Sequence, residues 1–149
     1  MSEVSMANNH FSSQSIVGVL ILNYNNLSDT VETLRSVQSL NYENLKILLV
    51  ENSTDKEVIE RLRAQFPTIQ IIENEKNLGY AGGNNIGIQY LLDNGSDYIL
   101  LLNNDVVLEQ DALRRLIEAM DKDSSCATCQ PLVHYYDDRE TVWSAGTQM

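Results

Sequence analysis

Amide, carboxylate and aromatic side chains recur in short clusters along the chain, each directly after a run of apolar residues. The first cluster contains Asn23, Tyr24 and Asn25, and the second contains Glu51 and Asn52. A tyrosine ring can stack on a flat heterocycle, and amide and carboxylate groups can hydrogen-bond its edge. These residue types indicate a site for a nucleobase or ribose. Each cluster alone also fits a polar turn that caps the next helix.

A glycine-rich stretch at residues 77–87 is the third cluster. It holds four of the chain's seven glycines together with Asn77, Asn84 and Asn85. Glycine lets the backbone approach a ligand closely, and the start of a helix favours an anion. We expect this stretch to lead into a helix that ends near Gly95. The alternative is a turn whose glycines serve tight packing of the helix on the sheet.

The fourth cluster, Asn103, Asn104 and Asp105, follows the very apolar residues 98–102. Three polar residues at the end of a buried strand would be costly to bury without a functional role. The carboxylate of Asp105 is a hard oxygen ligand suited to Mg²⁺ or Mn²⁺, and such an ion could bridge to a diphosphate. The alternative is a simple turn that closes the strand.

Alternation of strands and helices predicts the framework that positions these clusters. Compact apolar runs predict strands at residues 16–22, 45–50, 69–72 and 98–102, with shorter strands within 127–136 and 140–144. Apolar residues at helical spacing predict helices between the first four strands and after the fourth. We expect Asp29 with Glu32, and Thr54 with Glu57, to cap two of these helices. This order implies a mainly parallel sheet covered by helices on both faces, with ligands at the carboxyl ends of its strands.

Composition narrows the classes of partner. The chain of 149 residues has a formal net charge of −11 and only 10 lysine and arginine residues, which argues against nucleic acid and anionic membranes. A phosphate ligand would therefore need backbone N–H groups or a metal ion. No apolar run approaches the roughly 18 residues of a transmembrane segment. We expect a flexible, polar tail at residues 1–15, without signal-peptide character, and one domain at residues 16–149.

Cysteine and histidine residues do not indicate a redox or zinc site. Cys126 and Cys129 have the spacing of a redox pair, but apolar and β-branched residues follow them, which favours two cysteines in the core. His10 falls in the tail, and we interpret His134 as structural. Two cysteines give no disulfide framework, so we expect a cytoplasmic protein.

Taken together and in this order, the four clusters resemble glycosyltransferase family 2, from about residue 16 to residue 146. The rhamnosyltransferase-like branch, which extends cell-surface polysaccharides, is the most similar. The resemblance implies the GT-A fold, a Rossmann-like α/β/α sandwich with a mainly parallel sheet. It also implies that the chain holds the nucleotide-sugar-binding half and ends before the acceptor-binding half. We therefore expect exposed apolar surface near the end of the chain, with marginal stability or self-association.

The resemblance also implies residue roles. Tyr24 and Glu51 would contact the nucleobase, and Asp105 with Asn103 would hold a divalent metal ion, Mg²⁺ or Mn²⁺. Glu51 stands where the family usually has aspartate, and only one carboxylate remains of the usual D-x-D motif. The full set of expected substrate-binding residues is Asn23, Tyr24, Asn25, Glu51, Asn52, Asn77, Gly79, Gly83, Asn84, Asn85, Asn103 and Asn104.

The implied reaction is an inverting, metal-assisted transfer of a sugar from a dTDP- or UDP-sugar to a saccharide or lipid-linked acceptor. It needs a general base that deprotonates the acceptor hydroxyl, and no residue of this chain matches that position. A fragment that binds nucleotide sugar without transferring it is the alternative. A nucleotidyltransferase would need a basic glycine-rich loop after the first strand, and a dinucleotide oxidoreductase would need its glycine fingerprint there. The expected location is cytoplasmic, with peripheral attachment to the inner face of the plasma membrane left open.

Overall fold

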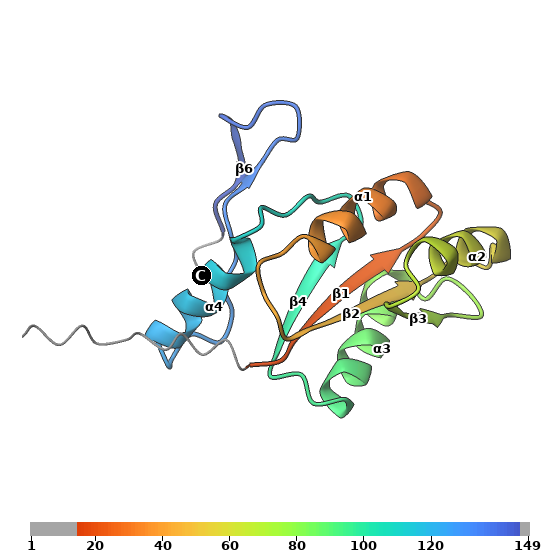
Figure 1. Ribbon diagram of the computed structural model, residues 1–149, viewed down its shortest axis with the longest axis horizontal. Coiled ribbons are helices and arrows are strands. Elements are labelled where there is room, and N and C mark those ends of the chain that lie inside the picture. The colour runs from red at the N-terminus through yellow and green to blue at the C-terminus, as the bar shows by residue number, and fades with distance from the viewer. Residues whose placement is uncertain (1–14, 147–149) are drawn as a thin grey trace, which may run out of the picture.

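The central strand β1 (Val17–Asn23) is apolar on both faces, and it lies in the middle of a four-stranded parallel sheet (Figure 1). The computed structural model describes residues 15–146. The strand order is β3-β2-β1-β4, with β2 at Leu45–Glu51, β3 at Gln70–Glu73 and β4 at Tyr98–Asn103. All three strand pairs are parallel, as the alternating pattern predicts.

Helices cover both faces of this sheet. Helices α1 (Leu27–Gln38), α2 (Lys56–Gln65) and α4 (Ala112–Lys122) share one core with the side chains on one face of β1. Helix α3 (Gly79–Asp93) covers the opposite face, where its Leu91 packs with Leu20. The chain thus crosses from one edge of the sheet to the other between β3 and β4. The expected three-layer α/β/α arrangement is confirmed.

A small antiparallel hairpin follows α4 and projects beyond the sheet and helices (Figure 1). It consists of β5 (Val133–His134) and β6 (Val142–Ser144), which are shorter than the strands that the sequence predicts. Large apolar side chains lie exposed on and beside this hairpin, which confirms the expected apolar surface in this part of the chain. They are Leu132, Tyr135, Tyr136, Val142 and Trp143.

The start of α1 differs from the expected capping pair of Asp29 and Glu32. Asn26 is the N-cap residue, and its Oδ1 accepts a hydrogen bond from the backbone N–H of Asp29. The Asn26 side-chain amide in turn donates to the Asp29 carboxylate across 2.7 Å. The cap therefore lies three residues earlier than predicted, because the helix begins at Leu27 directly after the first polar turn.

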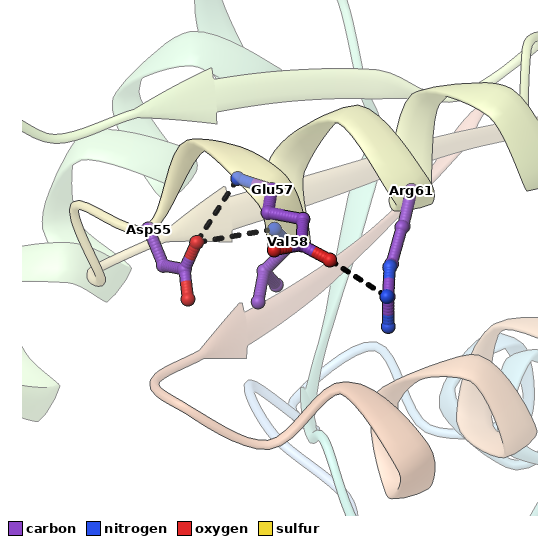
Figure 2. Close-up of polar contacts among 4 residues, drawn as sticks. All are labelled: Asp55, Glu57, Val58 and Arg61. Carbon is purple, nitrogen blue, oxygen red and sulfur yellow. Dashed lines mark hydrogen bonds and ion pairs between the residues drawn. The ribbon is translucent and has the colours of Figure 1, made fainter.

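The start of α2 also differs, by one residue, from the expected cap at Thr54. Asp55 caps the helix, and its Oδ1 accepts from the backbone N–H groups of Glu57 at 3.0 Å and Val58 at 3.4 Å (Figure 2). Glu57 pairs one turn ahead with Arg61. A carboxylate at the cap position satisfies free N–H groups and also interacts favourably with the helix dipole, which a threonine hydroxyl does less well.

The glycine-rich stretch is not a loop before a helix, because α3 begins at Gly79 and all of the stretch from that residue onward is helical. Gly83 and Gly87 lie four residues apart and so share the face that meets the sheet. A Cβ atom added at Gly83 would lie 2.4 Å from Leu22 Cδ1, and one at Gly87 would lie 2.3 Å from Leu20 Cδ1. These two glycines therefore serve close packing of the helix on the sheet.

Neither cysteine lies in the core, contrary to the expectation. Cys126 is half-buried and Cys129 is exposed, because the segment that joins α4 to β5 runs over the surface. The Cys129 thiol lies against Leu116, and its burial there raises its pKa, which is the direction opposite to that of a reactive cysteine. His134 is exposed in β5, and His10 lies outside the described residues. No helix within residues 15–146 is long and apolar enough to cross a membrane.

Candidate functional site

The carboxyl ends of the parallel strands bring the predicted clusters side by side. In the register of the sheet, Asn23 is paired with Glu51, and Leu22 is paired with Asn103. On the other side, Glu51 is paired with Glu73 at the end of β3. Adjacent strands lie about 4.8 Å apart, so Leu22 and Asn103, which are 81 positions apart in sequence, become neighbours at this edge.

A cavity of about 270 Å³ opens at this edge, between the loops that follow β1, β2 and β3. Whole ligand sites span about 300–1,000 Å³, so this cavity suits one part of a nucleotide. Tyr24 is 53% exposed, which leaves its ring free to stack on a ligand. The lining residues are Tyr24, Asn25, Asn52, Ser53, Thr54, Asp55 and Asn77.

Four residues predicted to bind substrate line this cavity: Tyr24, Asn25, Asn52 and Asn77. The other three lining residues, Ser53, Thr54 and Asp55, were not predicted from the sequence to bind a ligand. Ser and Asp directly before a helix are usual capping residues, and capping alone accounts for them in the sequence. Their signal was the unbroken run of polar residues after the end of β2.

Beneath the cavity lies a buried network of polar side chains centred on Asn23 and Glu51, which both have 0% exposure. Asn23 Nδ2 donates to Glu51 Oε2 across 2.6 Å, and the backbone N–H of Ser53 donates to Glu51 Oε1 across 2.9 Å. Asn104 Nδ2 donates to Asn23 Oδ1 across 2.9 Å. The Thr30 hydroxyl lies 2.9 Å from the same oxygen. These bonds satisfy a buried carboxylate and a buried amide that would otherwise be costly.

Asn52 is only 2% exposed, and it hydrogen-bonds with residues of three other segments of the chain. Its Oδ1 accepts from Asn74 Nδ2 across 2.7 Å, and its Nδ2 donates to the carbonyl of Gly79 across 3.1 Å. Its own backbone N–H donates to the carbonyl of Asn23. The absent side chain of Gly83 makes room for this amide, because a Cβ there would lie 3.0 Å from Asn52 Nδ2.

The first turn of α3 holds the remaining predicted residues of the glycine-rich stretch. Asn77 Oδ1 accepts from the backbone N–H of Gly79 across 2.8 Å, and Gly79 has a positive φ of 71°. Asn84 is buried and donates to the carbonyl of Tyr80, whereas Asn85 is exposed. The N-cap residue Leu78 makes no side-chain cap, and the side-chain acceptor at the start of α3 is instead Asn77, which serves the N–H of Gly79.

The three predicted residues at the end of β4 and in the turn after it lie in different surroundings. Asn104 enters the buried network, and Asn103 accepts a hydrogen bond from the Tyr80 hydroxyl across 3.4 Å. Asp105 is exposed and lines a second cavity, of about 260 Å³, beside α1. The structure therefore does not place Asp105 in the wall of the first cavity. The second cavity is lined by Asp29, Glu32, Thr33, Asp105, Val107 and Tyr136.

In the second cavity, the Tyr136 hydroxyl donates to Glu32 Oε1 across 2.6 Å, and this hydrogen bond raises the pKa of Tyr136. Residues 15–146 contain no group of three or more His, Cys, Asp or Glu side chains arranged to hold a metal ion. The Asp105 carboxylate and the Asn103 side-chain oxygen are hard ligands of the kind that Mg²⁺ binds together with substrate phosphates. They lie in different surroundings, because Asp105 lines the second cavity and Asn103 accepts from Tyr80.

Comparisons with known proteins agree with this architecture. The chain is 29% identical over 101 residues to the low-salt glycan biosynthesis hexosyltransferase Agl10 of Haloferax volcanii, a match that covers 67% of this chain and 31% of that protein. It is 30% identical over 122 residues to the uncharacterized protein y4gI of Sinorhizobium fredii, which covers 79% of this chain and 12% of that protein.

Two solved structures share the fold. The mannosyltransferase PcManGT of Pyrobaculum calidifontis, in complex with GDP-Man and Mn²⁺, matches with a TM-score of 0.59 and 15% identity over 72% of this chain and 33% of that chain. TarS 1-349 of S. aureus, in complex with UDP, matches with a TM-score of 0.57 and 18% identity over 72% of this chain and 32% of that chain. The chain spans about a third of the length of the hexosyltransferase and of both solved chains.

The sequence profile of glycosyl transferase family 2 matches residues 18–147, which is nearly the whole chain. That range includes all four polar clusters and the cavity that three of their loops enclose. The chain belongs to glycosyl transferase family 2.

Proposed function

We propose that this chain forms the nucleotide-sugar-binding part of a glycosyltransferase. The reaction transfers a sugar from a nucleoside-diphosphate sugar to a saccharide or lipid-linked acceptor. One observation carries the proposal: a cavity with an exposed tyrosine, Tyr24, lies at the carboxyl edge of a parallel sheet in a family 2 chain. The GDP-Man complex of PcManGT and the UDP complex of TarS support the choice of donor class.

In this proposal the nucleobase stacks on Tyr24 in the first cavity, and the diphosphate lies toward the start of α3. With a net charge of −11, the chain has few cations to offer a diphosphate. A helix start provides backbone N–H groups and the positive end of the helix dipole instead. Gly79, at the first position of α3, lets the backbone approach the phosphates without a side chain in the way.

Asp105 and Asn103 are the residues that would hold a divalent metal ion. When bound, such an ion supplies positive charge that stabilises the departing nucleoside diphosphate. Its affinity rests on one carboxylate and one amide, so we expect binding of metal and nucleotide to be strongly coupled. The phosphates of the ligand would complete the coordination.

In an inverting transfer, the acceptor hydroxyl attacks the anomeric carbon from the side opposite the diphosphate, while a general base removes its proton. We assign no residue to that base. Asp138 is occupied in the hairpin, where its carboxylate accepts from the Thr141 hydroxyl across 2.6 Å. A dTDP-linked rhamnose is the first donor to test, and a cytoplasmic location with peripheral membrane attachment is part of the same proposal.

Binding without transfer is the second candidate function. The observation that favours it is the composition of the first cavity, whose lining has one carboxylate, Asp55. That carboxylate already caps α2. An assay for release of nucleoside diphosphate from UDP- and dTDP-sugars in the presence of saccharide acceptors separates the two functions.

The test of the proposed site is calorimetric titration of the chain with UDP and dTDP, with and without Mn²⁺. We expect binding that Mn²⁺ strengthens, and we expect Asp105→Ala to lose that strengthening. Asp137→Ala, which removes an exposed carboxylate from the hairpin, is the matched control and should bind like the parent chain. Failure of the well-folded parent chain to bind either nucleotide would exclude the proposed site.

A further inference from the structure

One residue in the wall of the first cavity carries a buried side-chain hydroxyl that lacks a hydrogen-bond partner. Within residues 15–146, three buried side-chain hydroxyls have no partner: those of Thr33, Ser53 and Ser96. Of these, only Ser53 lines the first cavity, and the residue is 4% exposed. A buried hydroxyl without a partner costs free energy, so its place beside a ligand cavity calls for a partner from the ligand.

Glu51, the residue that the family resemblance assigns to the nucleobase, already accepts hydrogen bonds from other residues of the chain. It has 0% exposure and is not among the residues that line the cavity. Its Oε2 accepts from Asn23 Nδ2, and its Oε1 accepts from the backbone N–H of Ser53. Because the carboxylate is fully buried, a base could reach it only if the residues around it moved.

Asn52, which lies between Glu51 and Ser53, also has hydrogen-bond partners for both polar atoms of its side chain. The side chain of Asn52 uses its oxygen to accept from Asn74 and its nitrogen to donate to Gly79. Among the three residues Glu51, Asn52 and Ser53, the side chain of Ser53 alone therefore has an unused polar atom next to the cavity. The bond from its backbone N–H to Glu51 holds the backbone that carries that hydroxyl.

We propose that the Ser53 hydroxyl, and not the Glu51 carboxylate, hydrogen-bonds the nucleobase of the donor, and that Glu51 is a positioning residue that holds Ser53. This inference rests on the proposed function of the first cavity. The longer side chain of glutamate, compared with the aspartate usual in the family, lets its carboxylate turn inward to Asn23 and Ser53.

A hydroxyl and a carboxylate differ in the bases that they select. A carboxylate accepts hydrogen bonds only, so it favours uracil and thymine, which present an N–H at ring position 3, over cytosine, which presents a lone pair there. A hydroxyl can donate or accept, and so it pairs with either edge. We therefore expect UDP, dTDP and CDP to bind with affinities within a few-fold of one another, whereas a carboxylate contact would disfavour CDP by about 10-fold or more.

Titration of the parent chain, Ser53→Ala and Glu51→Gln with UDP, dTDP and CDP tests the assignment, with unfolding temperature measured alongside. Ser53→Ala should weaken all three nucleotides by about 5–10-fold without lowering the unfolding temperature. Glu51→Gln should lower the unfolding temperature and weaken all three nucleotides in proportion, so that the UDP-to-CDP ratio stays constant.

Ser96→Ala is the matched control. Its hydroxyl is also buried and unpartnered among the described residues, but it lies before β4, at the opposite edge of the sheet from the cavity. It should leave nucleotide affinity unchanged.

Two results would overturn the assignment while leaving the proposed function intact. The first is parent-like binding by Ser53→Ala. The second is a UDP-to-CDP ratio that is large in the parent chain and collapses in Glu51→Gln. If Glu51→Gln does not fold, the parent ratio and Ser53→Ala still decide the matter. Absence of nucleotide binding by the folded parent chain would instead exclude both the assignment and the proposed function.

Discussion

Asn23 and Asn104 lie 81 residues apart in sequence, yet the side-chain amide of Asn104 donates to the side-chain oxygen of Asn23 across 2.9 Å. Asn23 continues the connection to Glu51, whose carboxylate holds the backbone of Ser53. A continuous chain of hydrogen bonds therefore runs from the turn after β4, where a metal ion is proposed, to the wall of the first cavity. Buried polar networks of this kind hold their members rigidly when every member is satisfied.

Asn23→Ala should destabilise the fold and weaken nucleotide binding together. The substitution leaves Glu51 Oε2 without its donor and removes one of the two acceptors of Asn104 Nδ2, and an unsatisfied buried group costs about 1–3 kcal/mol. Chemical denaturation measures the first effect and calorimetric titration with UDP measures the second. Asn85→Ala, at an exposed position of α3, is the control and should change stability by less than about 0.5 kcal/mol. Equal stability of the two variants would show that the network contributes nothing.

Gly83→Ala and Gly87→Ala should separate packing from binding. Both place a Cβ less than 2.5 Å from a leucine of β1, so each should destabilise by about 1–3 kcal/mol. At Gly83 the new atom also meets the amide of Asn52, which lines the first cavity, whereas at Gly87 it meets Leu20 alone. Nucleotide affinity, measured where both variants remain folded, should fall in Gly83→Ala and persist in Gly87→Ala. A loss of binding in both would mean that helix displacement, and not the Asn52 contact, is responsible.

The cap of α2 can be assigned by a pair of substitutions. Asp55→Ala removes the acceptor of two backbone N–H groups and should destabilise by about 1 kcal/mol, whereas Thr54→Ala should have little effect. The difference in the free energy of unfolding in urea measures this. The reverse order of the two values would restore Thr54 as the cap, which local sequence alone predicts.

Exposed apolar side chains of the hairpin region predict self-association. Trp143 is 63% exposed, and it is the chain's one tryptophan, so its fluorescence reports directly on this surface. We expect its emission to shift to shorter wavelength as protein concentration rises, and sedimentation to show larger species. Trp143→Lys should reduce the association measured by sedimentation. A preparation that stays monomeric and melts sharply at high concentration would contradict this prediction.

The amino-acid sequence by itself determined the order of strands and helices and the positions of the polar clusters. Apolar runs such as residues 16–22 and 98–102 are long enough and rich enough in branched residues to specify buried strands. Polar residues such as Asn23 and Asn103 therefore had to fall at strand ends. Because parallel strands place those ends at one edge, the location of the cavity follows from local pattern alone.

Tertiary structure alone decided which polar side chains turn inward and which face the cavity. Glu51, Asn52 and Ser53 are consecutive and polar, but the first two are held by Asn23, Asn74 and Gly79, which come from other segments of the chain. The same holds for Gly83. Only when α3 lies against β1 is it clear that a side chain at this position would collide with Leu22. Local sequence sets the conformation of a segment, whereas the direction of a side chain depends on partners that folding brings from far along the chain.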